Sequence, residues 1–335
     1  MPSKAFRGEV WENMDPRVLQ AIARANEEAV DGGVGNDSYS LRAAAYVQRF
    51  FKEKIHAVYT LNGTGANMLA MKAMLDRFSS VICSSETHIN VYEAGAFEYT
   101  LDCKILPVNS ADGKLSAALV REALESAAAN FIPKVVVITQ PTERGTLYTL
   151  EELTQLCSYA HSRGLYVYMD GARLGNALEA LHTDLTEMIE GTGVDAFSVG
   201  GTKSGAMFGE MVVFRREEFA RHLPYLQKQS FQHFDRSKFL GVQFTCLLEE
   251  GIWLENAAKG NRRARLLAEK ALEKGIESCY PVETNMVFLP ITQEQFRRLS
   301  EVYDVQYWDK DRKMVRFVAT ANTGEDAIEK LISLL

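Results

Sequence analysis

The sequence predicts an α/β fold, with a mostly parallel central sheet in a large domain followed by a smaller C-terminal α+β domain. Two observations support this prediction. Through the first two thirds of the chain, short and continuously apolar segments rich in β-branched residues alternate with helix-like segments. Such continuous apolar runs are typical of parallel strands covered by helices on both faces. After about residue 236 a long helical stretch replaces this alternation and leads into further strands and helices.

The expected elements of the large domain follow from the apolar runs and from the turn residues between them. The strand-like segments are residues 58–61, 81–83, 104–108, 134–139, 166–170, 196–199 and 210–214. The helix-like segments are residues 66–77, 115–129 and 150–163, and Gly164 ends the last of them. In open parallel sheets, ligands bind beyond the carboxyl ends of the strands, so we expect the site there.

The C-terminal part is expected to form a separate α+β unit. Its helical stretch runs to about residue 274, and because glycine weakens helices we expect breaks near Gly251 and Gly260. The expected elements that follow are a strand over 285–289, a helix over 293–302, strands over 305–308 and 314–319, and a final helix from about residue 324. We place the large domain at residues 14–250, the small domain at 251–335, and an N-terminal segment, residues 1–13, near the active site.

Composition restricts the class of protein. A chain of 335 residues, 47% hydrophobic and 24% charged, can bury a large core and has the make-up of a globular protein. Its net charge of −7 argues against nucleic acid as a partner. With no long apolar window and no apolar signal sequence, we expect no membrane span and a cytoplasmic location. The five cysteines are scattered without the spacing of a metal site, so we interpret them as inert core thiols.

Lys203 is the most informative residue of the chain. It follows the apolar strand 196–199 within a glycine-rich turn, and a lysine at such a strand end is rarely a core residue. Upstream, another apolar strand ends at Asp170. An acid at one strand end and a lysine after the next strand suit pyridoxal phosphate (PLP). The lysine forms a Schiff base with this cofactor, and the acid keeps the pyridine nitrogen protonated.

A phosphate-binding turn is predicted at Gly63, Thr64 and Gly65, between a strand and a helix. Glycines expose backbone N–H groups there, the helix N-terminus favours an anion, and Thr64 adds a hydroxyl. Taken alone this pattern is also compatible with an ordinary structural turn. Followed along the chain by Asp170 and Lys203, it strengthens the prediction of a PLP site.

Taken together, these motifs resemble the threonine aldolase group of the β-eliminating lyase family, which are fold-type-I PLP enzymes. The similarity extends over nearly the whole chain. The segments that carry it are Tyr39 with residues 35–37, and residues 62–67, 86–90, 93–96, 140–143, 169–173, 200–203 and 314–317. The resemblance implies a fold-type-I, PLP-dependent transferase-like architecture and an aldehyde-lyase activity. The ordered set of motifs is specific for the family and less specific for the substrate.

The resemblance also implies roles for individual residues. Lys203 is expected to form the Schiff base, Asp170 to contact the pyridine nitrogen, and His88 to stack on the cofactor ring. Arg173 and Arg316 resemble the family arginines that hold the cofactor's phenolic oxygen and the substrate carboxylate, for which a planar guanidinium is well suited. For Arg316, pairing with a structural acid is the competing interpretation, and for His88 it is simple packing.

The chain departs from the family at two positions. Well-studied bacterial members carry a Ser-Asp pair near the start, and their serine hydroxyl helps to bind the substrate carboxylate; an ungapped alignment places Gly8 and Glu9 there. We therefore expect a serine at position 8 to leave substrate binding unchanged or to tighten it. A second family histidine corresponds to Glu143 in this chain. The base that takes the β-hydroxyl proton is then Glu143, His88 or an ordered water.

The resemblance predicts a PLP-dependent enzyme that cleaves L-threonine or L-allo-threonine to glycine and an aldehyde. Another β-eliminating lyase, a phenylserine-type aldolase, and a PLP-binding regulatory protein without activity remain alternatives. Family members complete their sites across a dimer interface, so we expect a homodimer or homotetramer with shared active sites. Lys228 and Arg236, which lie in a basic stretch, are candidates to reach the phosphate of a neighbouring subunit.

Overall fold

The computed structural model describes residues 2–29, 31–127 and 130–335, and its large domain is built on a seven-stranded sheet. The strand order is β1-β7-β6-β5-β4-β2-β3. The strands are β1 (His56–Thr60), β2 (Ser79–Ser84), β3 (Lys104–Val108), β4 (Ile132–Thr139), β5 (Tyr166–Asp170), β6 (Ala196–Gly200) and β7 (Glu210–Phe214). Only β7 runs antiparallel to its neighbours in this sheet. The mostly parallel sheet is therefore confirmed, and the expected strands lie within about two residues of the observed ones.

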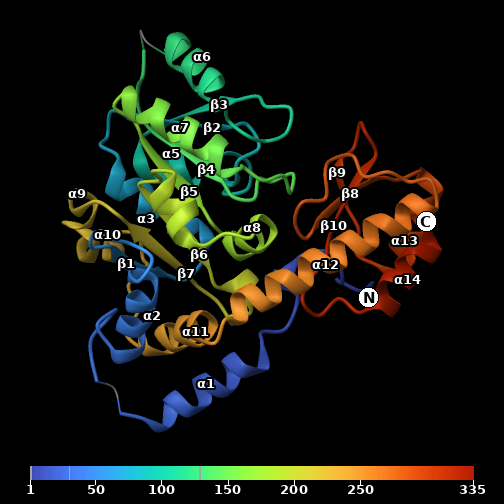
Figure 1. Ribbon diagram of the computed structural model, residues 1–335, viewed down its shortest axis with the longest axis horizontal. Helices are drawn as coiled ribbons and strands as arrows, with labels where there is room; N and C mark the ends of the chain where they lie inside the picture. Colours follow the sequence, from blue (N-terminus) through green and yellow to red (C-terminus); the bar gives the residue numbers. More distant parts are fainter. Residues whose placement is uncertain (1, 30, 128–129) are drawn as a thin grey trace.

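Helices cover both faces of this sheet (Figure 1). They are α1 (Pro16–Glu27), α2 (Ser38–Gln48), α3 (Gly63–Met74), α4 (His88–Val91), α5 (Ala96–Leu101), α6 (Ala117–Ala127), α7 (Leu150–Ser162), α8 (Leu174–Leu181), α9 (Glu217–Ala220), α10 (Leu223–Gln229) and α11 (Lys238–Glu249). Thr149 begins α7 with a capping box that includes Glu152, which explains why this helix was predicted closely. The expected end of the helix over 115–129 falls on residues 128–129, outside the described residues.

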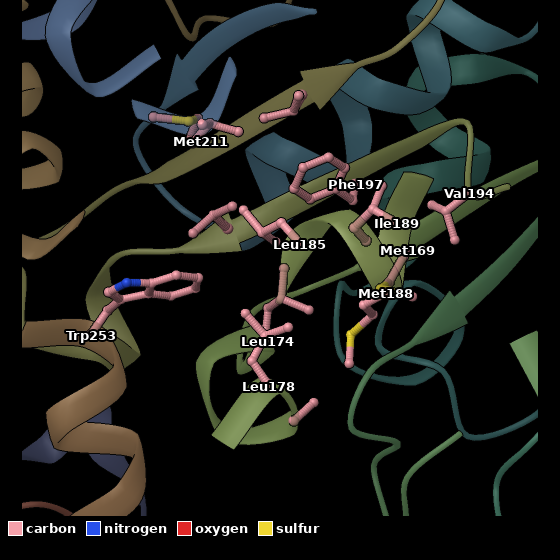
Figure 2. Packing of buried hydrophobic residues seen from close by; sticks show 14 of the residues in the cluster. Met169, Leu174, Leu178, Leu185, Met188, Ile189, Val194, Phe197, Met211 and Trp253 are labelled. Carbon is pink, nitrogen blue, oxygen red and sulfur yellow. The ribbon is translucent and has the colours of Figure 1, made fainter. Parts of the chain in front are cut away.

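Adjacent residues of a strand supply two separate cores. In β4, Val136 packs into the cluster under α7, α8 and α11, whereas Val135 and Val137 pack into the cluster under α3. Successive side chains of a strand point to opposite faces, so a strand covered on both sides must be apolar throughout. Figure 2 shows the first of these clusters, in which Met169 and Phe197 from the sheet lie near Leu174, Leu178 and Trp253.

The small domain packs α12 (Ile252–Glu273), α13 (Gln293–Val302) and α14 (Glu325–Leu334) against an antiparallel sheet of order β8-β10-β9. Its strands are β8 (Met286–Pro290), β9 (Tyr307–Asp309) and β10 (Met314–Val318). The break expected at Gly251 is confirmed, with φ of +69°. The prediction of a break at Gly260 was wrong, because α12 continues through this residue. A Cβ at Gly260 would lie 3.2 Å from the Ala319 carbonyl oxygen, so the glycine allows close packing inside a continuous helix.

α12 belongs to both cores. Trp253, in its first turn, packs in the core of the large domain, whereas Leu267 and Ala271, near its other end, pack in the core of the small domain. Figure 1 shows this helix leading from the large sheet towards the smaller one. The division at residues 250 and 251 stays a prediction, and it coincides with the start of this connecting helix.

The N-terminal segment packs on the small domain before the chain returns to the large one. Ser3 forms a bridge with Tyr303, the Val318 amide donates to the Phe6 carbonyl at 2.9 Å, and the Phe6 ring is buried in the core of the small domain. A 3₁₀ turn, η1 (Glu9–Trp11), follows and precedes α1. Residues 8–11 thereby come to lie beside the strand ends of the large sheet.

The strands that carry Asp170 and Lys203 approach each other closely at their carboxyl ends. The Gly200 amide donates to the Gly171 carbonyl at 3.1 Å. A Cβ on Gly200 would overlap the Ala172 carbonyl, and one on Gly171 would overlap the Ser198 carbonyl. Glycine at both positions therefore lets the two backbones meet and brings the acid and the lysine to one edge of the sheet.

We expect Gly200→Ala to lower the free energy of unfolding by about 1 to 3 kcal/mol, because a methyl group forced against backbone atoms must displace a strand end. Chemical denaturation measures this change. Gly33→Ala is the matched control, since a Cβ at Gly33 meets no atom within 4 Å. Equal stability of the two variants would mean that the strand ends separate without loss of stability.

Candidate active site

Two cavities meet at the carboxyl edge of the large sheet, and Lys203, His88, Glu143 and Arg173 line both of them. The inner cavity, of about 200 Å³, also contains Gly63, Thr64, Asn67, Asp170 and Glu210. The outer cavity, of about 480 Å³, is lined by the N-terminal segment, including Gly8, and by Tyr92, Trp308 and Arg316. Most of the residues predicted for the site are therefore brought together by the fold.

Lys203 lies in the 3₁₀ turn η3 (Thr202–Ser204), which follows β6 and is held by Gly201 and by Gly205 at φ +115°. Burial and then repulsion by Arg173 lower the pKa of Lys203. A lower pKa increases the fraction of neutral amine, which is the nucleophilic form. No hydrogen bond or ion pair engages the amine within the described part of the chain, so it is available to react.

A buried hydrogen-bond network joins Asp170 to His88. Asn67 Nδ2 donates to Asp170 Oδ2 at 3.1 Å and to Glu93 Oε1 at 2.8 Å, and the same Glu93 oxygen lies 2.8 Å from His88 Nδ1. Burial lowers the pKa of His88, but its bond to Glu93 and the charges of Asp170 and Glu143 outweigh burial and raise it overall. The network holds the imidazole and the acid in fixed positions on one side of the inner cavity.

The predicted phosphate turn forms the first turn of α3. Asn62 caps this helix, and its side-chain oxygen accepts from the Gly65 amide at 2.8 Å. Gly63 and Thr64 line the inner cavity, whereas Gly65 does not and packs under the Gln232 side chain. The groups available to an anion in the cavity are therefore those of Gly63 and Thr64, at the positive end of the helix.

Arg173 is engaged by Glu9. Its Nε and Nη2 atoms donate to the two carboxylate oxygens of Glu9, both at 2.7 Å, and Asn285 Nδ2 donates to Glu9 Oε1 at 2.7 Å. Burial alone would raise the pKa of Glu9, but Arg173 and then Lys203 lower it to about 2. Glu9 therefore stays ionised and links the N-terminal segment to both domains.

The backbone conformation at Gly8 bears on the effect expected of a serine at this position. Its φ of +146° is one that residues with a side chain rarely adopt, although a Cβ would meet no atom within 4 Å. A serine there would add strain of about 1 to 3 kcal/mol. The neutral or favourable effect expected of a serine on substrate binding stays a prediction; this backbone conformation argues against it, and the ungapped alignment carries no information on φ.

Arg316, on β10, is a half-buried cation without an acid partner among the described residues. Its guanidinium carbon lies 4.3 Å from the centre of the Trp308 ring, and no acid lies within ion-pair distance in the part of the chain that the structure describes. Burial and repulsion by Arg173 lower the pKa of Arg316. Pairing with a structural acid, the competing interpretation from the sequence, therefore receives no support here. An uncompensated guanidinium in a cavity is suited to bind an anion.

Comparison with known proteins identifies the family. The family model described as Beta-eliminating lyase matches residues 16–294. This chain belongs to the β-eliminating lyase family. It is 34% identical to the low specificity L-threonine aldolase of Pseudomonas sp. (strain NCIMB 10558), with 98% of this chain and 96% of that protein covered. The Pseudomonas aeruginosa enzyme of the same name is also 34% identical, over 89% and 87% of the two chains.

Solved structures agree with the fold of this β-eliminating lyase. A Leishmania major threonine aldolase matches with a TM-score of 0.93 and 28% identity, covering 99% of this chain and 98% of that one. A Thermus thermophilus aspartate aminotransferase mutant, 20% identical, matches with a TM-score of 0.73 over 96% and 92% of the chains, which supports the fold alone. The fold-type-I prediction is confirmed, and the β-eliminating lyase family is PLP-dependent.

The two basic residues predicted to reach a neighbouring subunit lie on the surface of this β-eliminating lyase. Lys228 and Arg236 are exposed and line neither cavity, so a role in a neighbouring site stays a prediction. In the ranges 2–29, 31–127 and 130–335, no helix combines the length and the apolar character that crossing a membrane requires.

Sequence reasoning assigned no role to three residues that the structure places at the site. Asn67 lies within a recognised motif, but its two hydrogen bonds need the fold to become visible. Glu9 was noted only as a departure from the family pattern. Glu210 begins a predicted strand shortly after Lys203, and an acid at that strand end was the available signal.

We expect Glu9→Gln to lower the free energy of unfolding by about 3 kcal/mol at neutral pH, because Arg173 loses its buried partner. The folded pKa of Glu9, about 2, lies below its usual value of 4.5. Its contribution is therefore complete above the usual pKa and is lost as the pH falls towards the folded one. Denaturation of wild type and variant across this pH range measures the difference.

The matched control is Glu27→Gln, which alters an exposed acid at the end of α1. Equal stability of Glu9→Gln and wild type at neutral pH would contradict the role of Glu9 as the buried partner of Arg173.

Proposed function

We propose that this protein is a PLP-dependent aldolase that cleaves L-threonine and L-allo-threonine to glycine and an aldehyde. Its relatives from Pseudomonas and Leishmania bear threonine aldolase names. The observation that carries the proposal is the outer cavity, which contains both the uncommitted amine of Lys203 and the uncommitted guanidinium of Arg316. An amino acid substrate needs both, since its amino group must meet the cofactor at the lysine while its carboxylate is held.

The residues of the inner cavity fit PLP. Lys203 supplies the amine, Asp170 a buried carboxylate for the pyridine nitrogen, His88 a flat ring for stacking, and Gly63 and Thr64 a helix N-terminus for the phosphate. When bound, PLP provides the electron sink for the pair of electrons released as the Cα–Cβ bond breaks. Asn67 and the Ala172 amide donate to Asp170, which holds the carboxylate in place.

Arg316 is the residue best placed to hold the substrate carboxylate. Arg173 is largely committed to Glu9, and of its guanidinium atoms only Nη1 makes no bond to a described residue. Arg316 donates no hydrogen bond to a described residue, and the Trp308 ring restricts its position. Fixing the carboxylate limits rotation of the substrate about its Cα–N bond. The orientation about this bond determines which bond at Cα is broken.

Glu143 is the best candidate for the base that removes the β-hydroxyl proton. Its carboxylate lines both cavities and makes no hydrogen bond to a described residue. His88 is less suited to this step, because its raised pKa and its bond to Glu93 favour the protonated ring. Since Nδ1 faces Glu93, Nε2 of His88 is the atom left to deliver a proton within the cavity.

A phenylserine-type substrate is the second candidate. The outer cavity carries the aromatic side chains of Trp11, Tyr92 and Trp308, and the Tyr92 and Trp308 rings lie 5.9 Å apart. Aromatic walls favour a flat apolar β-substituent over a methyl group. The chemistry at Cα is the same for both substrates.

Two further proposals concern the assembly and the location. We infer that the active form is a homodimer or homotetramer in which Lys228 and Arg236 reach the neighbouring site. Their exposure on the segment beside Gln232, which packs over Gly65, supports this. A cytoplasmic location fits the predominantly buried free cysteines.

We expect Lys203→Ala to fold, to lack the Schiff-base absorption band after addition of PLP, and to lose turnover, because no other described lysine lines the cavities. The assay measures glycine released from L- and D-threonine, both allo forms, phenylserine and serine. Borohydride reduction followed by peptide mapping identifies the modified lysine. Labelling of another lysine, or turnover of none of these substrates by wild type, would refute the proposal.

We expect Glu143→Gln to reduce kcat by about a hundredfold or more while KM and the absorption band stay near their wild-type values, because general-base catalysis contributes about 10² to 10⁴ in rate. Glu12→Gln, which alters an acid that lines neither of the two cavities, is the matched control. A change in kcat of less than about tenfold would exclude Glu143 as the base and return the role to His88 or water.

A further inference from the structure

Glu210 is a buried acid of the inner cavity to which the mechanism above gives no role. It is 3% exposed, its Oε2 atom has no hydrogen-bond partner within the described residues, and it lines the same cavity as Lys203, Asp170, Gly63 and Thr64. A buried carboxyl oxygen without a hydrogen-bond partner is unfavourable unless a ligand completes it. Its position therefore needs an explanation.

The strand register places Glu210 between the phosphate turn and the lysine turn. Glu210 pairs with Thr60 on β1 and with Gly200 on β6. The chain continues from Thr60 into the turn at Gly63 and Thr64, and from Gly200 into the turn at Lys203. Figure 1 shows β7 between β1 and β6.

The alternation of side chains along a strand shows to which face of the sheet Glu210 points. Val212, two residues along β7, packs in the cluster under α3, so Glu210 points to the side of the sheet from which α3 starts. Tyr168, two residues before Asp170, packs in the same cluster, so Asp170 shares this face. Asp170 lies two strands away, about 9 to 10 Å, whereas the β1 end is one strand away. Glu210 is thus nearer the phosphate end of the cavity than the end of the ring nitrogen.

We propose that Glu210 binds the phosphate group of PLP as a neutral carboxylic acid that donates a hydrogen bond. This inference rests on the proposed function in so far as PLP is the cofactor. A carboxylate in this place would repel a phosphate, whereas the acid form supplies one O–H donor. It adds a donor to the helix N-terminus of α3 without adding charge.

Electrostatics agree with the geometry. Burial raises the pKa of Glu210 to about 8; the charge of Lys203 acts against this increase, and the charge of Asp170 adds to it. The other titratable groups that line the cavity are His88, Glu143 and Arg173. At neutral pH the side chain is therefore mostly protonated. If only the acid form binds, affinity for a phosphate ligand falls as the pH rises through the pKa of Glu210.

The test uses pyridoxine 5′-phosphate, which lacks the aldehyde and cannot bond to Lys203. Its Kd for the protein freed of PLP is measured by calorimetry from about pH 6.5 to about pH 9.5. Between about pH 7 and about pH 9, we expect the Kd of the wild type to rise about tenfold more than the Kd of Glu210→Gln rises. The amide of Glu210→Gln keeps a donor and cannot titrate. Comparing the two proteins cancels the titrations of the ligand and of His88.

The controls separate this proposal from a structural role and from the proposed function. Glu143→Gln removes another acid of the cavity and is expected to keep the wild-type pH dependence. Glu210→Ala, which has no donor, is expected to bind several-fold more weakly than Glu210→Gln at about pH 7, and thermal melting checks that both are folded. Should Glu210→Gln fail to fold, Glu210→Ala provides the pH-independent comparison.

Equal pH dependence in wild type and in the folded Glu210 variants would overturn the proposal. So would no binding of pyridoxine 5′-phosphate at about pH 7 by wild-type protein that still forms its Schiff-base band with PLP. Absence of that band in wild type is a different result, since it would refute PLP as the cofactor and the proposed function with it.

Discussion

Partial burial of the reactive lysine is the constraint on which the arrangement of this site depends. A buried ammonium is unfavourable without a counter-charge, and a buried carboxylate is unfavourable without a cation. Glu9 and Arg173 neutralise each other through two hydrogen bonds, which leaves Lys203 without a direct counter-ion. The pKa of Lys203 is lowered as a result, with burial as the main cause. The same pairing commits Arg173, so the guanidinium of Arg316 remains for a ligand.

The N-terminal segment connects this arrangement of charges to both domains. Phe6 anchors the segment in the core of the small domain, and Glu9 then contacts Arg173 from the large domain and Asn285, which precedes β8 of the small one. Farther along, the Asp15 amide donates to the Gly205 carbonyl at 2.9 Å, beside the lysine turn. Removal of this segment would therefore expose the outer cavity and leave Arg173 without its acid.

The sequence predicted what depends on local periodicity and on chain order. Buried parallel strands read as continuous apolar runs, so Asp170 and Lys203 could be placed at neighbouring strand ends before the structure was known. Contacts between segments distant in the chain were not predictable in this way. The Glu9–Arg173 pair joins residues 164 positions apart, and the close approach that Gly260 allows is to Ala319, which belongs to another segment. Backbone conformation at Gly8 was equally hidden, since a glycine in the sequence does not reveal its φ.

The hydrogen-bond network of Asn67 connects the two groups that contact the cofactor ring in the proposed function. Its amide donates both to Asp170 and to Glu93, and Glu93 in turn binds His88. An amide nitrogen can only donate, so both partners must present acceptor oxygens to it. The Tyr168 hydroxyl fixes the orientation of this amide by donating to Asn67 Oδ1 at 3.0 Å. One network therefore positions both the imidazole of His88 and the carboxylate of Asp170, which would hold the ring nitrogen of PLP in the proposed function.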